Sequence, residues 1–496
     1  MTLAVIVAYL VLVLAIGAFS HRLFRGTGED YFLATRTIGP FVLLMSLFGT
    51  NMTAFALLGA SGEAYRTGIG VFALMPSAAA LVIPTIFFFV GTRLWALGKR
   101  HGYITQVQYF RDRWGSESLG LLLFVVLVAL VIPYLLIGIM AGGLTLNQVT
   151  SGRVPEWAGG LLICLVVMTY VTTGGLRGTA WANTFQTLVF MILGGVAFFY
   201  IVGEMGGLAK IMSQLSDQHP ELLIRGDKFL PIRVVTYSLI PLSVGMFPHL
   251  FMHFLTARRL DTFRTAVVAY PICIAIVWVP SVLLGLFGNL DFPGLSVPAS
   301  NSILVRLISR YAPGLLAGLL GAGVFAAVMS SLDSQVLSLG TMFTQDIVRH
   351  YGYHDRMSEK RQVLVGRLFV AGILLFAYVL SLFSTTTIFS LGTWSFTGFS
   401  SLFPIVAAAL FWKRSTKEGA YASILSVIVL WIYFFYQGWG NADYTVGGSG
   451  VMAVAVIMPA AAVAMILLSL MTKAPSPEVL QKFFAPRPAC PALRSS

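Results

Sequence analysis

Apolar stretches of about 20 residues, the length of a transmembrane helix, recur along the whole of this 496-residue chain. A segment that crosses the hydrocarbon core of a bilayer must pair all its backbone polar groups, which a helix does within itself. Only 10% of the residues are charged, whereas about a quarter are charged in a typical soluble domain. We therefore predict an all-α integral membrane protein with no separate soluble domain.

The apolar stretches number about 13, with a tight turn expected near residues 174–186 between the fifth and the sixth. Their centres lie near residues 12, 50, 82, 130, 165, 190, 244, 277, 327, 374, 399, 427 and 461. If the N terminus is outside, only eight of the 32 lysines and arginines fall in outside loops, which fits the enrichment of basic residues in cytoplasmic loops. We expect a multi-pass protein of the cell inner (plasma) membrane with its C terminus in the cytoplasm. Residues 1–472 would form the transmembrane domain, and the Pro-rich tail 473–496 would be disordered.

Two of the spans contain residues that interrupt a helix. The second has GTNMT (residues 49–53) at its centre, and the seventh has Gly245, Pro248 and His249. Proline lacks a backbone N–H, and an opened helix exposes carbonyl oxygens, which suit a hard cation such as Na⁺. Small-residue packing and a simple proline kink are the alternative interpretations. Two interrupted helices five spans apart, at corresponding positions of two halves, indicate a transporter binding site.

The ninth span carries polar residues on one side. From Ala327, helical spacing selects Ser330 or Ser331, then Ser334 and Ser338, as a stripe toward the inside end. Polar side chains in a span face a cavity or the bundle interior. Asp333 is a carboxylate within the span, which indicates a functional site unless it pairs with a basic residue of an inside loop.

Motifs of other function classes are absent from the sequence. It has no Walker A loop, no nucleophile elbow and no metal-spaced cluster, and its three cysteines are scattered. The excess of basic residues faces anionic lipid rather than nucleic acid. We predict a secondary transporter, not an enzyme, with no obligate protein partner.

Six segments resemble the sodium:solute symporter family. They are GEDYFLATRTIG (28–39), SLFGTNMTA (46–54), GGLRGTAWANTFQ (174–186), AAVMSSLDS (326–334), TQDI (344–347) and LFWKRSTKEGA (410–420). The resemblance implies the five-plus-five inverted-repeat fold of the leucine-transporter type. The core repeats would be about 39–204 and 235–412, with extra helices at both ends.

The resemblance also implies a Na⁺ site and a path for the ion to the inside. Carried over by motif, the Na⁺ ligands would be the carbonyls of Gly49, Met52 and Ala327 and the hydroxyls of Ser330 and Ser331. The exit path would be lined by Asn183, Asp333, Ser334 and Ser338. Family members often have an aspartate where this chain has Asn183, so Asp333 could supply the charge that is missing there.

The solute is expected between the second, fourth, seventh and eleventh spans. Candidate residues of its site are Phe55, Gln148, His249 and Trp394. Sugar-carrying members have polar side chains at the positions of Phe55 and Ala56, so a carboxylate, an amino acid or a related metabolite fits better. We predict Na⁺-coupled import of such a small organic solute.

Two alternatives to this function are kept. One is a proton-coupled or uncoupled carrier of the same fold, with Asp333 as the proton site. The other is a membrane solute sensor, which would need a signalling domain, whereas only about 24 residues follow the last predicted span.

Overall fold

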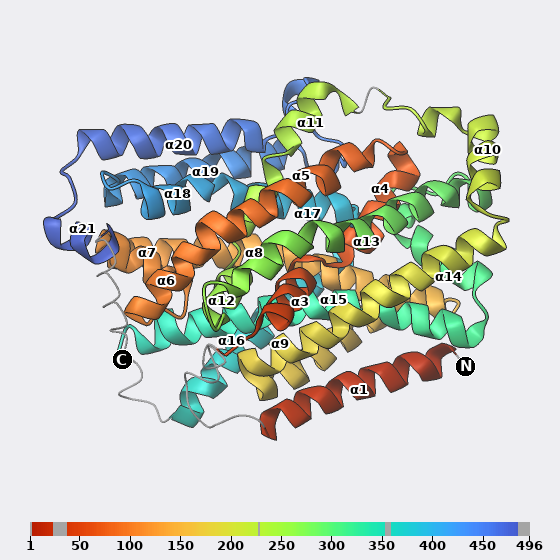
Figure 1. The fold of residues 1–496 in the computed structure, drawn as a ribbon, viewed down its shortest axis with the longest axis horizontal. Coiled ribbons are helices and arrows are strands. Elements are labelled where there is room, and N and C mark those ends of the chain that lie inside the picture. Colours follow the sequence, from red (N-terminus) through yellow and green to blue (C-terminus); the bar gives the residue numbers. More distant parts are fainter. Residues whose placement is uncertain (1, 23–36, 227–228, 353–358, 485–496) are drawn as a thin grey trace, which may run out of the picture.

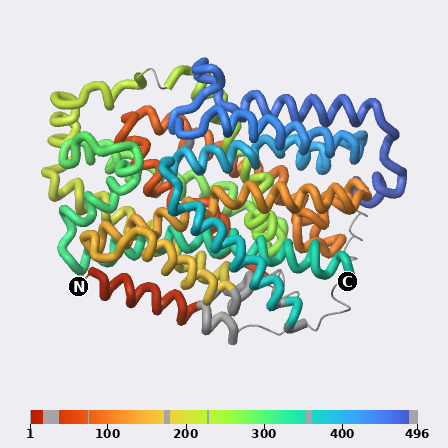
Figure 2. Tube along the Cα trace, turned by 180° about the vertical axis from the view of Figure 1, so that it is seen from behind, coloured from red at the N-terminus to blue at the C-terminus, as the bar shows by residue number. Residues whose placement is uncertain are grey.

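The computed structural model describes residues 2–22, 37–226, 229–352 and 359–484. In these ranges the chain is mostly helical, and its only β contact is an isolated bridge between Ile38 and Ala257. Helix α1 (Thr2–Arg22) lies along one edge of the molecule, and α19 (Lys417–Gln437) and α20 (Val454–Met471) lie along the opposite edge (Figure 1). Figure 2 shows the same two edges from behind. The predicted all-α class is confirmed.

Nine helical segments within the described ranges are long and apolar enough to cross a membrane. They are α5–η3–α6 (Val71–His101), α8 (Glu117–Val149), Thr179–Glu204 of α9, α13 (Thr262–Asp291), α15–η8 (Gly314–Arg349), Leu364–Phe383 of α16 (Glu359–Phe383), α17–α18 (Ile388–Phe411), α19 and α20. Shorter apolar helices, Thr2–Ile16 and Glu156–Thr169, lie at the first and fifth predicted spans. The count of 13 itself is not confirmed, because length and composition alone support nine spans, or up to eleven if each bent pair is one span.

Both predicted helix interruptions are present, and they lie five predicted spans apart. Helix α3 (Pro40–Asn51) is followed by η2 (Phe55–Gly59) and α4 (Ala60–Thr67) after a bend of 58°. In the seventh predicted span, α11 (Pro231–Tyr237) and η6 (Ile240–Gly245) precede α12 (Pro248–Thr256) with a bend of 54°. Helix α12 starts afresh at Pro248 because proline lacks the N–H that a continuous helix would need, and Phe247 before it is extended.

The start of one broken helix is tied to the end of the other by the backbone. The Ile38 amide donates to the Thr256 carbonyl at 3.2 Å, and the Arg258 amide donates to the Ile38 carbonyl at 3.0 Å. These bonds form the isolated bridge noted above. The two interrupted segments therefore approach each other at one end of the molecule, although about 200 residues of sequence separate them.

Helix α15 (Gly314–Met342) lies at the centre of the bundle. In the most apolar part of the α15 span, 83% of the residues are buried. The corresponding share is 28% for α16 and 28% for α20. It packs against α9 (Glu156–Glu204), α8, α1 and α3. The polar stripe of α15 therefore faces protein rather than lipid, as expected for polar side chains in a span.

Two local expectations differ from the structure. The region 174–186, expected as a tight turn, has helical backbone within α9. The chain nevertheless turns back within α9, because Glu156 lies beside Gly143 of α8 and Leu193 lies beside Gly323 of α15. The tail was expected to be disordered, yet α21 (Pro477–Phe484) packs on α7 (Gln106–Trp114). There Lys482 pairs with Asp112 at 2.6 Å, and the Arg113 guanidinium lies 5.1 Å from the Phe484 ring centre. Tail composition could not reveal this tertiary partner; residues 485–496 lie outside the described ranges.

Close packing of α3 on α9 depends on Gly49. A Cβ atom at this position would lie 2.0 Å from Thr187 Oγ1 and 3.3 Å from the Asn183 carbonyl oxygen. Distances below 3.0 Å force neighbouring atoms to move. The absence of a side chain at Gly49 therefore lets two helices approach until polar groups on both can meet.

We expect Gly49→Ala to destabilise the protein by about 1–3 kcal/mol, the usual cost of overpacking a core. Thermal unfolding in detergent would measure this as a lower Tm. Because the clash is with Thr187 Oγ1, adding Thr187→Ala should recover part of the loss.

Gly194→Ala is the matched control, because an added Cβ there has no atom within 4 Å. It should leave the Tm unchanged or slightly higher. Equal Tm values for Gly49→Ala and Gly194→Ala would contradict the close contact of α3 and α9.

Candidate ion and solute site

The carbonyl oxygens at the end of α3 have lost their helical partners. The helix ends at Asn51, and Met52 after it is extended, so the last turn lacks the amides of a next turn. The Ser330 hydroxyl of α15 donates to the Gly49 carbonyl at 2.9 Å, with the Ala327 carbonyl 3.1 Å away as a second acceptor. Three of the five predicted Na⁺ ligands, Gly49, Ala327 and Ser330, therefore meet at one point.

The other two predicted ligands lie beside this point. Ser331 is buried, and its hydroxyl donates to the Val328 carbonyl at 3.2 Å within its own helix. Met52 is the residue at which α3 opens, and its sulfur accepts a hydrogen bond from Trp278 Nε1 at 3.3 Å. Carbonyl and hydroxyl oxygens are ligands for a hard cation. No group of three or more His, Cys, Asp and Glu in the described part of the chain could hold a metal.

A buried network continues from this point along α15. The Thr50 and Ser334 hydroxyls are 2.7 Å apart, and Asn183 Nδ2 donates to both at 2.8 Å. Among the described residues, Asn183 Oδ1 has no hydrogen-bond partner. Ser338 follows one turn later, and its hydroxyl donates to the Gln335 carbonyl at 2.8 Å. Of the predicted exit-path residues, Asn183 thus bonds to Ser334, and Ser338 lies one helical turn further along α15.

Asp333 belongs to the same network. Its side chain is fully buried, and its Oδ1 accepts from the Ser334 hydroxyl at 3.2 Å. Asn183 donates to the same hydroxyl, so the amide on α9 and the carboxylate on α15 are joined through a single side chain. The Asp333 carboxylate and the Asn183 amide of the sixth predicted span are therefore bridged by the Ser334 hydroxyl.

The two histidines of α12 have different surroundings. His253 Nδ1 is 2.9 Å from the Ser46 hydroxyl, and its Nε2 is 3.3 Å from the Thr50 hydroxyl. Sequence analysis missed Ser46, Thr50 and His253 as members of the polar network. The four-residue spacing of Ser46 and Thr50, which places them on one helix face, was the available signal.

His249 faces aromatic rings instead. It stacks on Phe247, with ring centres 5.0 Å apart, and lies 5.6 Å from the ring of Tyr134. Neither of its ring nitrogens has a hydrogen-bond partner among the described residues, although the side chain is only 1% exposed. A buried polar group without a partner is costly, so these nitrogens are available to a bound molecule.

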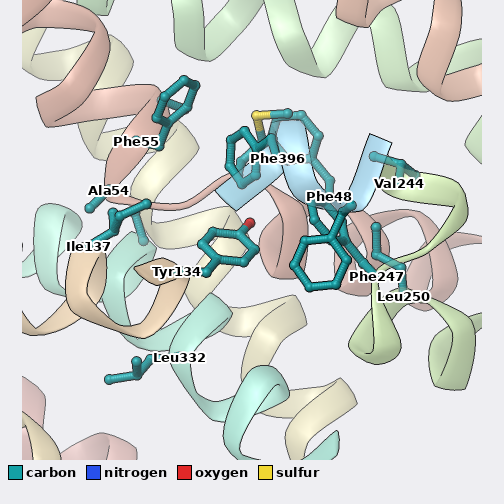
Figure 3. Packing of buried hydrophobic residues seen from close by; sticks show 14 of the residues in the cluster. Phe48, Ala54, Phe55, Tyr134, Ile137, Val244, Phe247, Leu250, Leu332 and Phe396 are labelled. Carbon is teal, nitrogen blue, oxygen red and sulfur yellow. The ribbon is translucent and has the colours of Figure 1, made fainter. Parts of the chain in front are cut away.

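Phe55 and His249 lie at two ends of one aromatic cluster. The Phe55 ring stacks on Phe389 of α17 (Ile388–Ser401) at 4.8 Å and lies 5.1 Å from Phe396. Phe396 in turn lies 5.0 Å from Tyr134. Figure 3 shows Phe55, Phe396 and Tyr134 in one region of the core. The structure therefore brings these two predicted solute residues into one region.

The other two predicted solute residues lie elsewhere. Trp394 packs against Phe435 of α19, with ring centres 5.4 Å apart, and against Tyr444 at 5.6 Å. Gln148 lines a separate cavity of about 470 Å³. The four residues do not form one wall, because a span number does not tell which way a side chain points around its helix.

Ionic contacts connect segments at the end that the charge distribution assigns to the outside. Arg66 of α4 bonds to Glu63 and to Asp443, both at 2.8 Å. Arg233 of α11 lies 3.7 Å from the same Asp443, which precedes α20. Segments from both broken helices are thus held to the loop between α19 and α20.

A second set of contacts lies at the other end, where Figure 1 shows α7 and α21. Asp346 of η8 (Phe343–Arg349) accepts from the Thr105 hydroxyl at 3.0 Å and lies 3.8 Å from the Arg111 guanidinium. Burial and a hydrogen bond to Asp112 raise the pKa of the Tyr103 phenol above its ordinary value, so it remains a donor. The end of the ninth predicted span is therefore bound to the segment that carries α7.

Comparison with known proteins decides the family. The profile of the sodium:solute symporter family matches residues 31–426. The chain belongs to the sodium:solute symporter family. Among curated relatives, the high-affinity proline transporter PutP of Bacillus subtilis is 27% identical over 444 residues, covering 84% of this chain and 89% of the relative. The sodium/proline symporter of Escherichia coli K12 is 27% identical over 487 residues, covering 92% and 90%.

Solved structures agree on the fold. A Na⁺-coupled sialic acid symporter in a substrate-bound outward-open state aligns with a TM-score of 0.77 and 16% identity, covering 95% of this chain and 98% of that one. The transporter MhsT in complex with L-phenylalanine aligns with a TM-score of 0.51 and 13% identity, covering 88% and 98%. These likenesses, with the two broken helices, confirm the leucine-transporter-type fold.

The family assignment confirms the predicted class of function. The chain is a membrane transporter rather than an enzyme, and it couples the transport of a small organic solute to Na⁺. The assignment favours Na⁺ over the proton of the alternative carrier, and transport over sensing.

Proposed function

We propose that this symporter imports a small amino acid or a related carboxylate, and that Na⁺ binds where the opened end of α3 meets α15. The observation that carries the proposal is the 2.9 Å contact between the Ser330 hydroxyl and the Gly49 carbonyl. An ion at this point would be held by the carbonyls of Gly49, Met52 and Ala327 and the hydroxyls of Ser330 and Ser331.

Na⁺ at this point would act on the solute through the backbone that connects Met52 to Phe55. Phe55 follows Met52 by three residues, and its amide is held by the Thr53 hydroxyl at 2.9 Å. An ion that binds the carbonyls before the break fixes the same backbone that positions Phe55. Because a ligand shifts a conformational equilibrium by its differential affinity, Na⁺ favours the conformation in which both elements are in place.

The solute region favours a compact molecule with a carboxylate. Its rings offer apolar surface, and its polar groups are few. The N terminus of α12 and the His249 nitrogens, which have no hydrogen-bond partner in the described part of the chain, face this region from one side. The first amides of a helix favour an anion, so a solute carboxylate at His249 is electrostatically supported. Two relatives are named as proline transporters, so we take proline as the first compound to test.

Release would proceed along the network below the ion. Asn183, Ser334 and Ser338 supply neutral oxygens, and Asp333 supplies a negative charge beside them. If the N terminus is outside, this network leads toward the cytoplasm, and inward flow of Na⁺ would drive import.

Removing both hydroxyls tests the ion site. We expect Ser330→Ala with Ser331→Ala to raise the Na⁺ concentration for half-maximal proline uptake by about tenfold for each ligand lost. Uptake into proteoliposomes would be measured over a series of Na⁺ concentrations. Ser281→Ala is the control, because that buried hydroxyl donates to the Val277 carbonyl within its own helix rather than to a proposed ligand. A Na⁺ dependence unchanged by the double substitution would sink the proposed site.

Moving the carboxylate tests the exit path. We expect Asp333→Asn to keep equilibrium binding of Na⁺ and proline but to slow net uptake about tenfold or more, because release loses its charge. Adding Asn183→Asp returns a carboxylate to the same hydroxyl, Ser334, and should restore much of the rate. If Asp333 only pairs with a basic residue of an inside loop, adding Asn183→Asp will not restore the uptake rate.

A thermal-shift screen tests the class of solute. L-proline, other small amino acids, small carboxylates, vitamins and sugars would be added with and without Na⁺. A true solute at about 100 times its Kd should stabilise the protein by about 2.7 kcal/mol, and only when Na⁺ is present. Stabilisation by sugars but not by amino acids or carboxylates would contradict the proposed class.

A further inference from the structure

The break before α12 exposes a backbone carbonyl that a side chain from another part of the chain takes up. Helix η6 ends at Gly245, Met246 follows it, and α12 begins at Pro248. Met246 is fully buried, and a buried carbonyl without a partner is costly. The Gln106 side chain meets this need, because its Nε2 donates to the Met246 carbonyl at 3.1 Å.

Gln106 is the first residue of α7, and 140 positions of sequence separate it from Met246. Its side chain is only 1% exposed. Of the two side-chain amide atoms, only the nitrogen can donate to a carbonyl, so the orientation of this amide is determined. Its Oε1 has no hydrogen-bond partner in the described part of the chain. The amide is therefore directed at the break rather than at its own helix.

Helix α7 is held at both of its ends. At the start, the Thr105 hydroxyl accepts from the Gln108 amide at 3.2 Å and donates to Asp346 Oδ1 at 3.0 Å. At the end, the buried Arg113 side chain donates from Nε to the Ala409 carbonyl at 3.1 Å. Helix α7 also packs on α12 itself. The first residue of α7 is thus presented to the break by a fixed helix.

The Met246 carbonyl is joined directly to the backbone of the solute region. Its carbon is bonded to the Phe247 nitrogen, and because the peptide unit is planar, the direction of the carbonyl sets the direction in which the chain enters Phe247. The Phe247 ring stacks on His249 at 5.0 Å and lies 5.5 Å from Tyr134 and 4.9 Å from Phe399. Rotation of this one peptide would therefore displace rings that surround the proposed solute position.

We propose that Gln106 is a positioning residue for the solute. By holding the Met246 carbonyl, it keeps Phe247 and the start of α12 in the arrangement that binds the solute. When α7 moves away from α12, this hydrogen bond is lost and the affinity for the solute falls, which couples movement of α7 to solute release. The effect on the solute rests on the proposed function, whereas the hold on the break does not.

Removing the donor tests the effect on the solute. Gln106→Met keeps nearly the same side-chain length and should raise the KM for L-proline about tenfold with kcat unchanged, because the bound arrangement loses a hydrogen bond to a buried carbonyl. Na⁺-dependent uptake into proteoliposomes would be measured, normalised to the amount of reconstituted protein. Na⁺ without solute should still raise the Tm of the variant.

Gln108→Met is the matched control on the same helix. The Gln108 side chain accepts from the Ile104 amide at 2.9 Å and does not bond to the break, so its loss should lower the Tm but leave the KM for L-proline unchanged. An equal rise in KM for Gln108→Met would mean that the stability of α7 matters and the Gln106 contact does not.

A donor that can be switched on by acid tests the hydrogen bond itself. A glutamate at this position donates only when its carboxyl is protonated, and burial favours that form. The KM of Gln106→Glu should therefore approach the wild-type value as the pH is lowered from about 8 to about 5.5, compared with Gln106→Met at each pH. The same KM for Gln106→Glu and Gln106→Met at every pH would overturn the role of the donor.

Hydrogen exchange without solute separates this inference from the proposed function. In Gln106→Met, the amides of residues 249–252 should exchange about tenfold faster, while those of residues 43–51 in α3 should not change. If exchange at residues 249–252 stays at the wild-type rate, Gln106 does not hold the break and the inference is wrong. If exchange rises but the KM for L-proline is unchanged, the hold on the break stands, and the proposed solute position beside His249 fails.

Discussion

The contact between the Gly49 carbonyl and the Ser330 hydroxyl is the point on which the rest of this structure depends. A helix that ends inside a bilayer leaves carbonyl oxygens that lipid cannot satisfy. Here the opened end of α3 is turned toward α15, and a hydroxyl pairs with the orphan oxygen at 2.9 Å. The approach that makes this possible depends on α9, because only a residue without a side chain fits at Gly49 against Thr187. The close packing of α3 against α9 at Gly49 therefore also places the Gly49 carbonyl next to the Ser330 hydroxyl, where the proposed ion would bind.

The break in α3 also divides the centre of the molecule into two environments. Before the break, Thr50 joins Asn183 and Ser334 in a buried polar network. After it, Phe55 enters a cluster of aromatic rings. Only two residues separate Met52 from Phe55, so movement of one end of this segment must affect the other. In the proposed function, this short connection would couple the ion to the apolar solute surface.

Sequence reasoning found the broken helices because glycine and proline act locally. Pro248 removes a backbone N–H and so weakens the helix just before it, and the glycine of GTNMT permits a helix to open. Proline alone does not decide a break, because α8 continues through Pro133 and α13 through Pro271 and Pro280. It also found the polar stripe of α15, because helical spacing alone places Ser330, Ser334 and Ser338 on one side. The family resemblance then supplied the pairing of the second and ninth predicted spans, which residue patterns alone did not provide.

The sequence by itself therefore determined the all-α membrane class, the location of the long apolar segments and the two places where a helix breaks, because each follows from local hydrophobicity or backbone chemistry. Only the tertiary structure decided which side chains meet. It placed His253 in the polar network and His249 among rings, although they are one turn apart on one helix. It also separated Gln148 and Trp394 from Phe55. The rotation of a helix about its axis depends on how it packs against its neighbours, and no single span encodes that packing.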